Sequence, residues 1–413
     1  MSSTTGALQH QPFFEALAAC DESSPAWRGM SAGFVTLRLF DAWMMEGRSV
    51  IAHDGWGVRS VREAIHLVGH GSAIRALLTS AVDAMEQAPA FSATTVAPRL
   101  MAYARALQFD GQWALAADVY RTVLVYAQPV DDADVLIAAN MNLGACLRVL
   151  ADFPEAHIAY TTAAEIATLR DDVMNVLRAR VAEANLAADR GNLPRAELIL
   201  DETITRAAQE GLRGIQAVAL HDRSVVARRR GDGERAVSLA YEALEKSDDQ
   251  SARDRVLSDL AATFFDMGLR SAARDAHLVL ASTAQEQYVR WAATINLLEI
   301  AAMDEREPVF EQYRRELVDA ALPASLAAHY HYYVGQGYRM FQRLDAARSA
   351  LRRAIEIATQ CGLNQVLIQA EESLSQIGER DVLVPVELAT TSPRVTEVAT
   401  AVRRMRSLVG VAD

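Results

Sequence analysis

The chain has 413 residues, of which 51% are hydrophobic and only 7% aromatic, and its formal net charge is −12 with a pI near 5.3. This length exceeds one small core and predicts either two or three domains or one elongated repeat array. The alanine-rich composition, poor in glycine and proline, favours many short helices and an all-α protein. The acidic balance disfavours nucleic acid and anionic membranes as partners.

Cysteine usage and the N-terminus bear on the compartment. The three cysteines, Cys20, Cys146 and Cys361, are far apart and odd in number, which fits a reducing cytoplasm better than a disulfide framework or a zinc ribbon. The N-terminus has no basic segment followed by an apolar one, and no stretch approaches the roughly 18 to 20 apolar residues of a membrane span. We therefore expect a cytoplasmic protein with no membrane partner.

The N-terminal part of the chain carries no repeat signature. Residues 1–30 are expected to be mobile, apart from a short helix at PFFEALAAC. Residues 31–92 predict three helices, in AGFVTLRLFDAWMMEGR, GVRSVREAIHLVG and SAIRALLTSAVDAMEQA. We interpret 31–92 as a helical cap or small bundle placed on the first repeat.

From Leu100 onward, five stretches each read as an apolar helix, a tight turn and a second apolar helix. Their turn residues are spaced by 40, 40, 40 and 37 positions and are Gly111, Ala151, Gly191, Gly231 and Gly268. Glycine or alanine suits a position where the helix must stop and the chain must reverse. Five residues further on lies an alanine that allows close helix approach, at Ala116, Ala156, Ala196, Ala236 and Ala273.

This pattern resembles the tetratricopeptide repeat, a helix-turn-helix unit of about 34 residues. The second unit matches best, at Leu143, Gly144, Leu147, Phe153, Ala156, Tyr160 and Ala163. The resemblance implies an α-α superhelix, a solenoid over 93–378 with about seven units plus a capping helix. Units of 37 to 40 residues depart from the family and imply longer helices or longer loops.

The last units and the C-terminus complete the predicted array. A sixth unit from Trp291 is degenerate, with the acidic turn DEREP, whereas the seventh regains the pattern at Gly335, Tyr338, Leu344, Ala347 and Ala354. LNQVLIQAEESLSQIG reads as a capping helix. Residues 379–413 predict a linker and the amphipathic helix VTEVATAVRRMRSLV. This helix docks either on its own chain or on a second copy, so a homodimer stays open.

Chemical motifs are scarce. The sequence has no phosphate-binding lysine loop, nucleophile elbow or zinc-protease helix. His66 and His70 are four residues apart on a predicted helix, with His53 upstream, but no carboxylate completes a metal set. The glycines of GDG at 231–233 and of GQG at 335–337 are explained by turns and packing. We expect no metal and no cofactor.

In the family that this pattern resembles, the first helices of successive units line the concave face and contact ligands. Numbered from the glycine position, the implied partner-binding residues are Arg105, Arg148, Arg178, Asn185, His221, Arg228, Arg229, Arg255, His329, Tyr332, Gln336 and Arg339. This basic set suits an acidic peptide or a C-terminal carboxylate, because arginine offers a planar fork of donors. The alternative is that these arginines pair with acidic residues of the neighbouring helix. The family's carboxylate clamp is not supported, because Val181 stands where a lysine is needed.

The segment AAHYHYYVGQGYRMF at 327–341 raises the question of an enzyme. An open solenoid face offers no water-poor pocket with an oriented acid–base pair, so we expect no catalysis. The leading hypothesis is a non-catalytic scaffold that binds an acidic peptide or protein segment in a basic concave groove. The alternative resembles a bacterial peptide-sensing regulator, whose N-terminal helices act on a protein partner.

Overall fold

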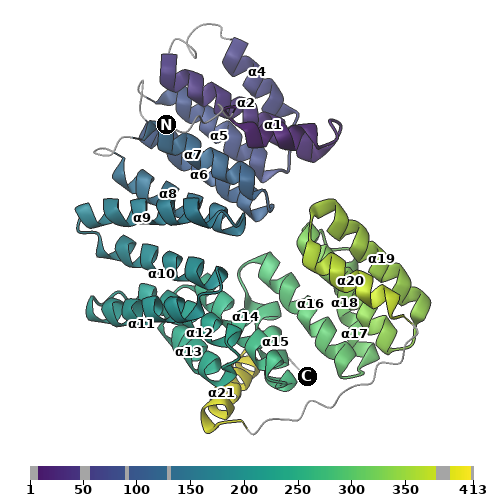
Figure 1. The fold of residues 1–413 in the computed structure, drawn as a ribbon. Coiled ribbons are helices and arrows are strands. Elements are labelled where there is room, and N and C mark those ends of the chain that lie inside the picture. The colour runs from purple at the N-terminus through teal and green to yellow at the C-terminus, as the bar shows by residue number, and fades with distance from the viewer. Residues whose placement is uncertain (1–7, 47–55, 89–92, 128–131, 378–390, 411–413) are drawn as a thin grey trace. The chain divides into compact units, whose positions relative to one another are not determined.

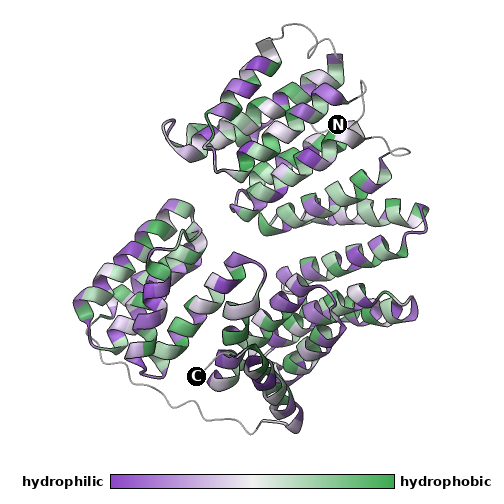
Figure 2. Cartoon of the chain, turned by 180° about the vertical axis from the view of Figure 1, so that it is seen from behind, coloured by the Kyte–Doolittle hydropathy of each residue, from purple (hydrophilic) through white to green (hydrophobic). Residues whose placement is uncertain are grey.

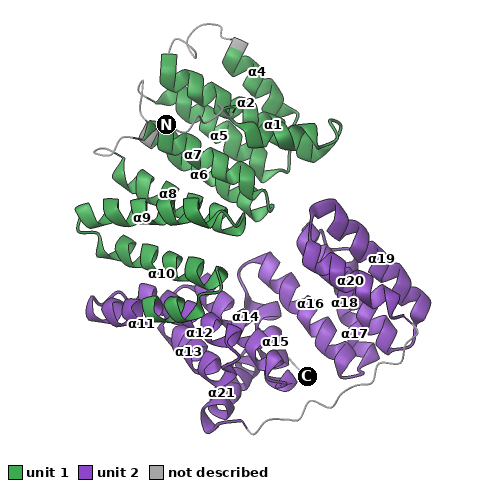
Figure 3. Cartoon of the chain, in the orientation of Figure 1, with its two compact units in different colours: residues 1–199 green, residues 200–413 purple. Residues whose placement is uncertain are grey.

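The computed structural model describes residues 8–46, 56–88, 93–127, 132–377 and 391–410. These residues form twenty α-helices in chain order, which confirms the all-α class (Figure 1). The chain divides into two compact units, residues 1–199 and 200–413 (Figure 3). Most helices carry both hydrophobic and hydrophilic residues (Figure 2). No helix in the described part of the chain is long and apolar enough to cross a membrane.

The N-terminal helices are α1 (Gln11–Ala18), α2 (Pro25–Glu46), α4 (Trp56–His66) and α5 (Ala73–Gln87). The three helices expected over 31–92 correspond to α2, α4 and α5. Residues 8–30, expected to be mobile outside PFFEALAAC, form α1 and the first turns of α2, and Phe13 is fully buried. Residues 1–7 and His53 lie outside the described residues. The described helical structure therefore begins with α1.

A buried histidine ties α1 to two other helices. His10 precedes α1, and its Nε2 lies 2.8 Å from Asp41 Oδ2 of α2 while its Nδ1 lies 2.7 Å from Asp118 Oδ2. Burial by itself lowers the pKa of His10, but the hydrogen bonds to Asp118 and Asp41 outweigh burial and raise this pKa to about 9. The imidazolium thus donates to both carboxylates at neutral pH.

The repeat units alternate first helices of constant length with second helices of variable length. The first helices have 17 residues each: α6 (Ala93–Phe109), α8 (Ala133–Val149), α10 (Val173–Asp189), α12 (Arg213–Arg229), α14 (Gln250–Asp266), α16 (Gln287–Met303) and α18 (Ala324–Met340). The second helices are α7 (Trp113–Tyr126), α9 (Phe153–Leu169), α11 (Leu193–Gln209), α13 (Gly233–Lys246), α15 (Arg270–Thr283), α17 (Glu307–Val318) and α19 (Leu344–Cys361). Two single helices follow, α20 (Asn364–Ser375) and α21 (Pro393–Val409).

Helix length explains the period seen in the sequence. Two 17-residue helices and two three-residue turns, as in α8 and α9, make the 40-residue unit. In the units that begin with α12 and α14 the second helix has only 14 residues, and the period falls to 37. In the units that begin with α8, α10, α12 and α14 the excess over the family's unit therefore lies in longer helices, whereas in the first unit six residues separate the 14-residue α7 from α8.

Each predicted turn residue has a left-handed backbone. The φ angle is 76° at Gly111, 80° at Gly191, 81° at Gly231 and 76° at Gly268, and Ala151 adopts 60° without being glycine. Around Ala151, the amide of Asp152 donates to the carbonyl of Leu147 over 2.9 Å, which closes the end of α8. A left-handed residue therefore ends the first helix in each of these units.

Small residues set the spacing between paired helices. The five alanines that follow the turns are fully buried. A Cβ on Gly144 would lie only 2.5 Å from the ring of Tyr160, so glycine is needed there. In the sixth unit Phe310 replaces the alanine, and it packs where a Cβ on Gly337 would lie 2.2 Å away. In the degenerate unit, the small residue that allows close packing is therefore Gly337, on the next helix α18.

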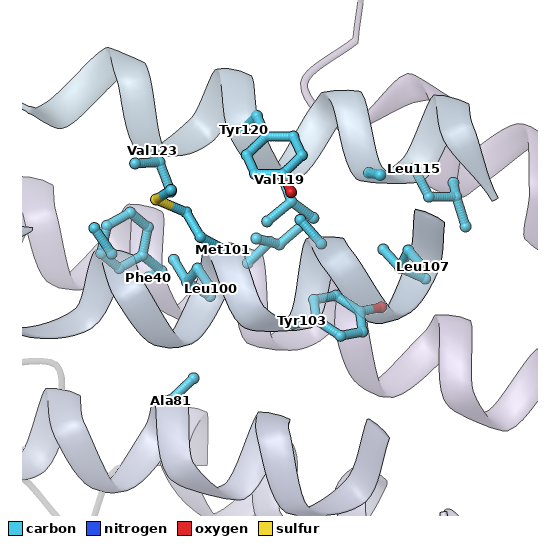
Figure 4. Close-up of a cluster of buried hydrophobic side chains, with 14 of the residues drawn as sticks. Phe40, Ala81, Leu100, Met101, Tyr103, Leu107, Leu115, Val119, Tyr120 and Val123 are labelled. Atoms are coloured by element: carbon cyan, nitrogen blue, oxygen red, sulfur yellow. The ribbon is translucent and has the colours of Figure 1, made fainter. Parts of the chain in front are cut away.

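The first unit of the array is joined to the cap by one continuous core. Figure 4 shows side chains of α6 and α7 directed toward one another. These residues, with Phe40 of α2 and Ala81 of α5, belong to one cluster that includes Leu100, Met101, Tyr103, Leu107, Leu115, Val119, Tyr120 and Val123. Burial of this apolar surface stabilises the cap and the first repeat together.

Replacing Ala151 by glycine should stabilise the protein. Alanine in the left-handed region costs about 1 kcal/mol relative to glycine, so Ala151→Gly should raise the free energy of unfolding by about 0.5 to 1 kcal/mol. The matched change Ala164→Gly within α9 should lower it by about 1 kcal/mol. Urea denaturation followed by circular dichroism measures both, and a shift of the same sign in both variants would contradict the turn assignment.

The His10 pair predicts a pH dependence. Because the pKa of His10 is raised above its unfolded value of 6.5, its stabilisation is fully present below pH 6.5 and is lost as the pH rises through about 9. The contribution is about 3 kcal/mol as an upper bound. Denaturation of the wild type and of His10→Asn between pH 6 and 9.5 measures it. Equal slopes against pH in the two proteins would argue against the charged pair.

Candidate binding surface on the first helices

The first helices contact one another across successive repeats. Helix α8 touches both α6 and α10 in the N-terminal unit, while α12 touches α14 and α16 touches α18 in the C-terminal unit. We name the side chains three, six, ten and thirteen positions before each turn residue, together with Arg229 two positions before Gly231, the first-helix row. Each compact unit carries its own part of the row.

The twelve residues expected on this row differ in exposure. Four are exposed: Arg105, Arg178, Arg229 and Arg255. Seven are half-buried: Arg148, Asn185, His221, Arg228, His329, Tyr332 and Gln336. Arg339 is only 8% exposed, so the expectation that it faces a groove is wrong.

Helix α20 covers part of the first-helix row in the seventh unit. The amide of Gln336 donates to Ser373 Oγ of α20 over 2.8 Å and to Tyr332 Oη over 2.9 Å. Tyr332 packs in apolar clusters that include Leu363 and Ala370. In this unit α20 therefore takes the place that the next first helix holds elsewhere, and the row at α18 is partly covered by the chain itself.

Several basic residues of the row form ion pairs with the next first helix. Arg148 pairs with Asp189, and Arg228 Nε lies 2.6 Å from Asp266 Oδ2. Both pairs join the position three before one turn residue to the position two before the next. His221 Nε2 of α12 likewise lies 2.7 Å from Asp259 Oδ2 of the next first helix, α14. For these three residues the structure favours the alternative interpretation, in which basic side chains pair within the array.

The exposed arginines provide the positive charge that remains accessible. Arg178 and Arg255 occupy the same position, thirteen residues before their turn residues, and Arg178 also donates to Asn175 of its own helix over 3.3 Å. Arg105 lies six residues before Gly111. Val181 has an apolar side chain and is only 6% exposed, so it contributes no polar group to the row.

The tyrosine and histidine segment of α18 divides between two environments. His329 Nδ1 donates to the carbonyl of Ser325 over 2.8 Å, and its ring stacks on Tyr333 at 6.5 Å. Burial raises the pKa of Glu299 to about 7, and a hydrogen bond from Tyr333 only partly offsets this. The α16 and α18 side chains thus form a polar contact that the sequence did not reveal.

A cavity of about 500 Å³ lies between α17, α18 and α19. Tyr330, His331 and Val334 of α18 line it together with Arg314 and Arg353. Burial, followed by the charge of Arg353, lowers the pKa of His331. The sequence feature that points to this irregular region is the degenerate sixth unit. Its second helix, α17, has only 12 residues, and Leu317 and Val318 at its C-terminus line the cavity.

The two histidines of α4 and the following turn bind an arginine. The guanidinium of Arg75 donates to His66 Nδ1 over 2.8 Å and to His70 Nδ1 over 3.0 Å. Both Nδ1 atoms must accept, because arginine has no acceptor. Within the described ranges, no group of three or more His, Cys, Asp or Glu side chains is placed to hold a metal ion.

These helix-turn-helix units define a tetratricopeptide-like helical repeat protein. No protein-family model matches the sequence, and no curated protein matches it. Among solved structures, the chain is similar to the apo form of the quorum sensor NprR from B. thuringiensis, with 13% identity, a TM-score of 0.44, and coverage of 83% of this chain and 92% of that chain. It is also similar to the Rap conjugation gene regulator of plasmid pLS20 in complex with the Phr* peptide, with 12% identity, a TM-score of 0.44, and coverage of 93% and 99%. At these identities the likeness concerns the fold alone.

The ion pairs along the row should couple adjacent repeats. A double-mutant cycle with Arg148→Ala and Asp189→Ala should give a coupling energy of about 1 kcal/mol, because both side chains are about three-quarters buried. The more exposed Arg228 and Asp266 should couple by about 0.5 kcal/mol. Urea denaturation measures both cycles, and zero coupling in each would show that the pairs contribute nothing to the array.

Proposed function

We propose that this chain is a non-catalytic interaction protein that binds an extended segment of a protein partner along its first-helix row. The observation that carries the proposal is the recurrence of exposed arginine at one repeat position, Arg178 and Arg255, on helices of identical length. Within each compact unit, an exposed arginine on a row that includes several first helices suits an extended ligand better than a single reaction centre.

The paired and exposed basic residues have different roles in this proposal. Arg148 and Arg228 hold neighbouring first helices through Asp189 and Asp266, which preorganises the row and limits the ordering cost of binding to the partner's side. The exposed arginines, Arg105, Arg178 and Arg255, then contact the partner. Their planar donor forks favour carboxylates, so the partner segment is acidic or ends in a carboxylate.

The role of Arg228 affects how the proposal is tested. Reversing its charge breaks the pair with Asp266 and disturbs the array itself, so a loss of binding in that variant has two explanations. Arg178 and Arg255 are the better positions, because both are exposed and neither is joined to the next first helix by an ion pair in the described part of the chain.

Charge reversal at the exposed positions should weaken binding. Partners are recovered by affinity capture from the native organism, purified, and measured by calorimetry against wild type, Arg178→Glu and Arg255→Glu. Each variant should lose affinity by about tenfold or more, because a lost charge-assisted hydrogen bond costs about 1.5 to 3 kcal/mol. The matched control is Arg352→Glu, on the second helix α19 and also exposed.

The control should bind as the wild type does, and all variants should show the wild-type denaturation midpoint. If every purified partner binds Arg178→Glu and Arg255→Glu with unchanged affinity, the first-helix row is not the binding surface. A loss of the same size in Arg352→Glu would show a dependence on total charge instead.

A further inference from the structure

The C-terminal helix α21 fills a groove formed by two second helices. It contacts α13 and α15, and the sequence had left open whether it docks on its own chain (Figure 1). Val395, Val398 and Val402 are at most 1% exposed and join the apolar cluster of these helices. The spacing of these valines by three and four residues places them on one helical face. The groove is thus shaped for one amphipathic helix.

A buried carboxylate gives the groove a charge requirement. Asp275 of α15 is 2% exposed, and its Oδ1 accepts a hydrogen bond from Arg406 Nη1 over 2.8 Å. Its Oδ2 accepts from Arg403 Nε over 3.4 Å. A carboxylate covered by a helix without such partners would be strongly disfavoured. The occupant must therefore place cationic side chains one and four residues after its last buried valine.

Two further contacts fix the start of the occupant. The Arg394 guanidinium lies 5.4 Å from the centroid of the Tyr241 ring, and the amide of Ser392 donates to Glu234 Oε1 over 3.0 Å. The groove therefore contacts the helix along its whole length. The Tyr241 ring contacts its start, apolar side chains contact its middle, and Asp275 binds the arginines near its end.

The attachment of α21 is local. Seventeen residues, 376–392, separate it from α20, and only three of its own 17 residues are buried. Leu408 is 88% exposed. The residues that start and end the helix lie within the segment itself, because Pro393 is its first residue and Gly410 ends it with a φ of 75°. Helix α21 is therefore a separable ligand for a groove that the rest of the C-terminal unit builds.

We propose that the groove between α13 and α15 is a second protein-binding site, which takes an amphipathic helix of a partner protein. That helix carries apolar residues at positions i, i+3 and i+7 and arginines at i+8 and i+11. In the structure α21 occupies the site and acts as a competitor that the partner helix displaces. This site is independent of the first-helix row, because α13 and α15 are second helices.

Tethering determines how strongly α21 competes. A helix held by a short linker faces its groove at an effective concentration of the order of 1 mM. If the free helix binds the open groove with a Kd of about 10 μM, the tethered copy weakens binding of a competitor by about 100-fold. A partner must therefore bind more tightly than α21 does, or act where α21 has been released.

The experiment uses the full-length chain and a fluorescent synthetic peptide with the sequence of residues 391–410. Val398→Asp together with Val402→Asp releases α21 by placing two charges in the apolar cluster. Fluorescence anisotropy should show that this variant binds the peptide at least tenfold more tightly than the wild type does. The matched control is Leu408→Asp, which alters an exposed residue of the same helix and should bind as weakly as the wild type.

A second measurement tests the charge requirement. In the released variant, Asp275→Asn should weaken binding of the native peptide at least fivefold, and should have less than a twofold effect on a peptide in which Arg403 and Arg406 are changed to methionine. If circular dichroism shows that the released variant has lost helicity, Arg403→Glu with Arg406→Glu replaces it, because these changes leave the valines intact.

Three results would overturn the proposal. The first is equal peptide affinity in the wild type, the released variant and the Leu408→Asp control. The second is an effect of Asp275→Asn that does not depend on the peptide's arginines. The third is a wild-type chain that dimerises by exchange of α21 at the concentrations used, as measured by light scattering, because the natural occupant is then a second copy.

Discussion

The structure depends on reversing the chain within three residues between each 17-residue first helix and the second helix that follows it. A left-handed residue ends each first helix, as at Gly191 and Gly231, and three residues later the next helix is under way. The buried alanine that follows allows the two helices to approach closely. Because these two requirements recur in all units except the sixth, where Phe310 replaces the alanine, the positions along one first helix are repeated on the next and form a row.

This repetition also decides how charge is distributed. Arg148 and Arg228 hold the same position in their units and meet aspartates that share a position in the next units. The array thereby uses part of its positive charge to hold its own helices, whereas Arg178 and Arg255, thirteen positions before their turn residues, are exposed. The same repeat pattern therefore places both the ion pairs and the exposed arginines.

Buried charges with two opposite partners occur near both ends of the chain. His10 lies between Asp41 and Asp118 and fixes α1, while Asp275 lies between Arg403 and Arg406 and fixes α21. Each group is costly to bury alone, so each specifies which segment covers it. The positions of α1 and α21 are in this way specified by charge as well as by apolar contact.

The sequence by itself determined the helical class, the turn residues and the small residues, because these depend on backbone conformation and on contacts within one unit. Ala151 was identified as a turn residue without being glycine, since the 40-residue period required it. Only the tertiary structure decided the pairing of Arg148 with Asp189, the burial of Arg339, the cavity beside α17 and the docking of α21 on its own chain. Those features depend on which side chains of different units come together, and helical periodicity places a residue on a face without specifying what covers that face.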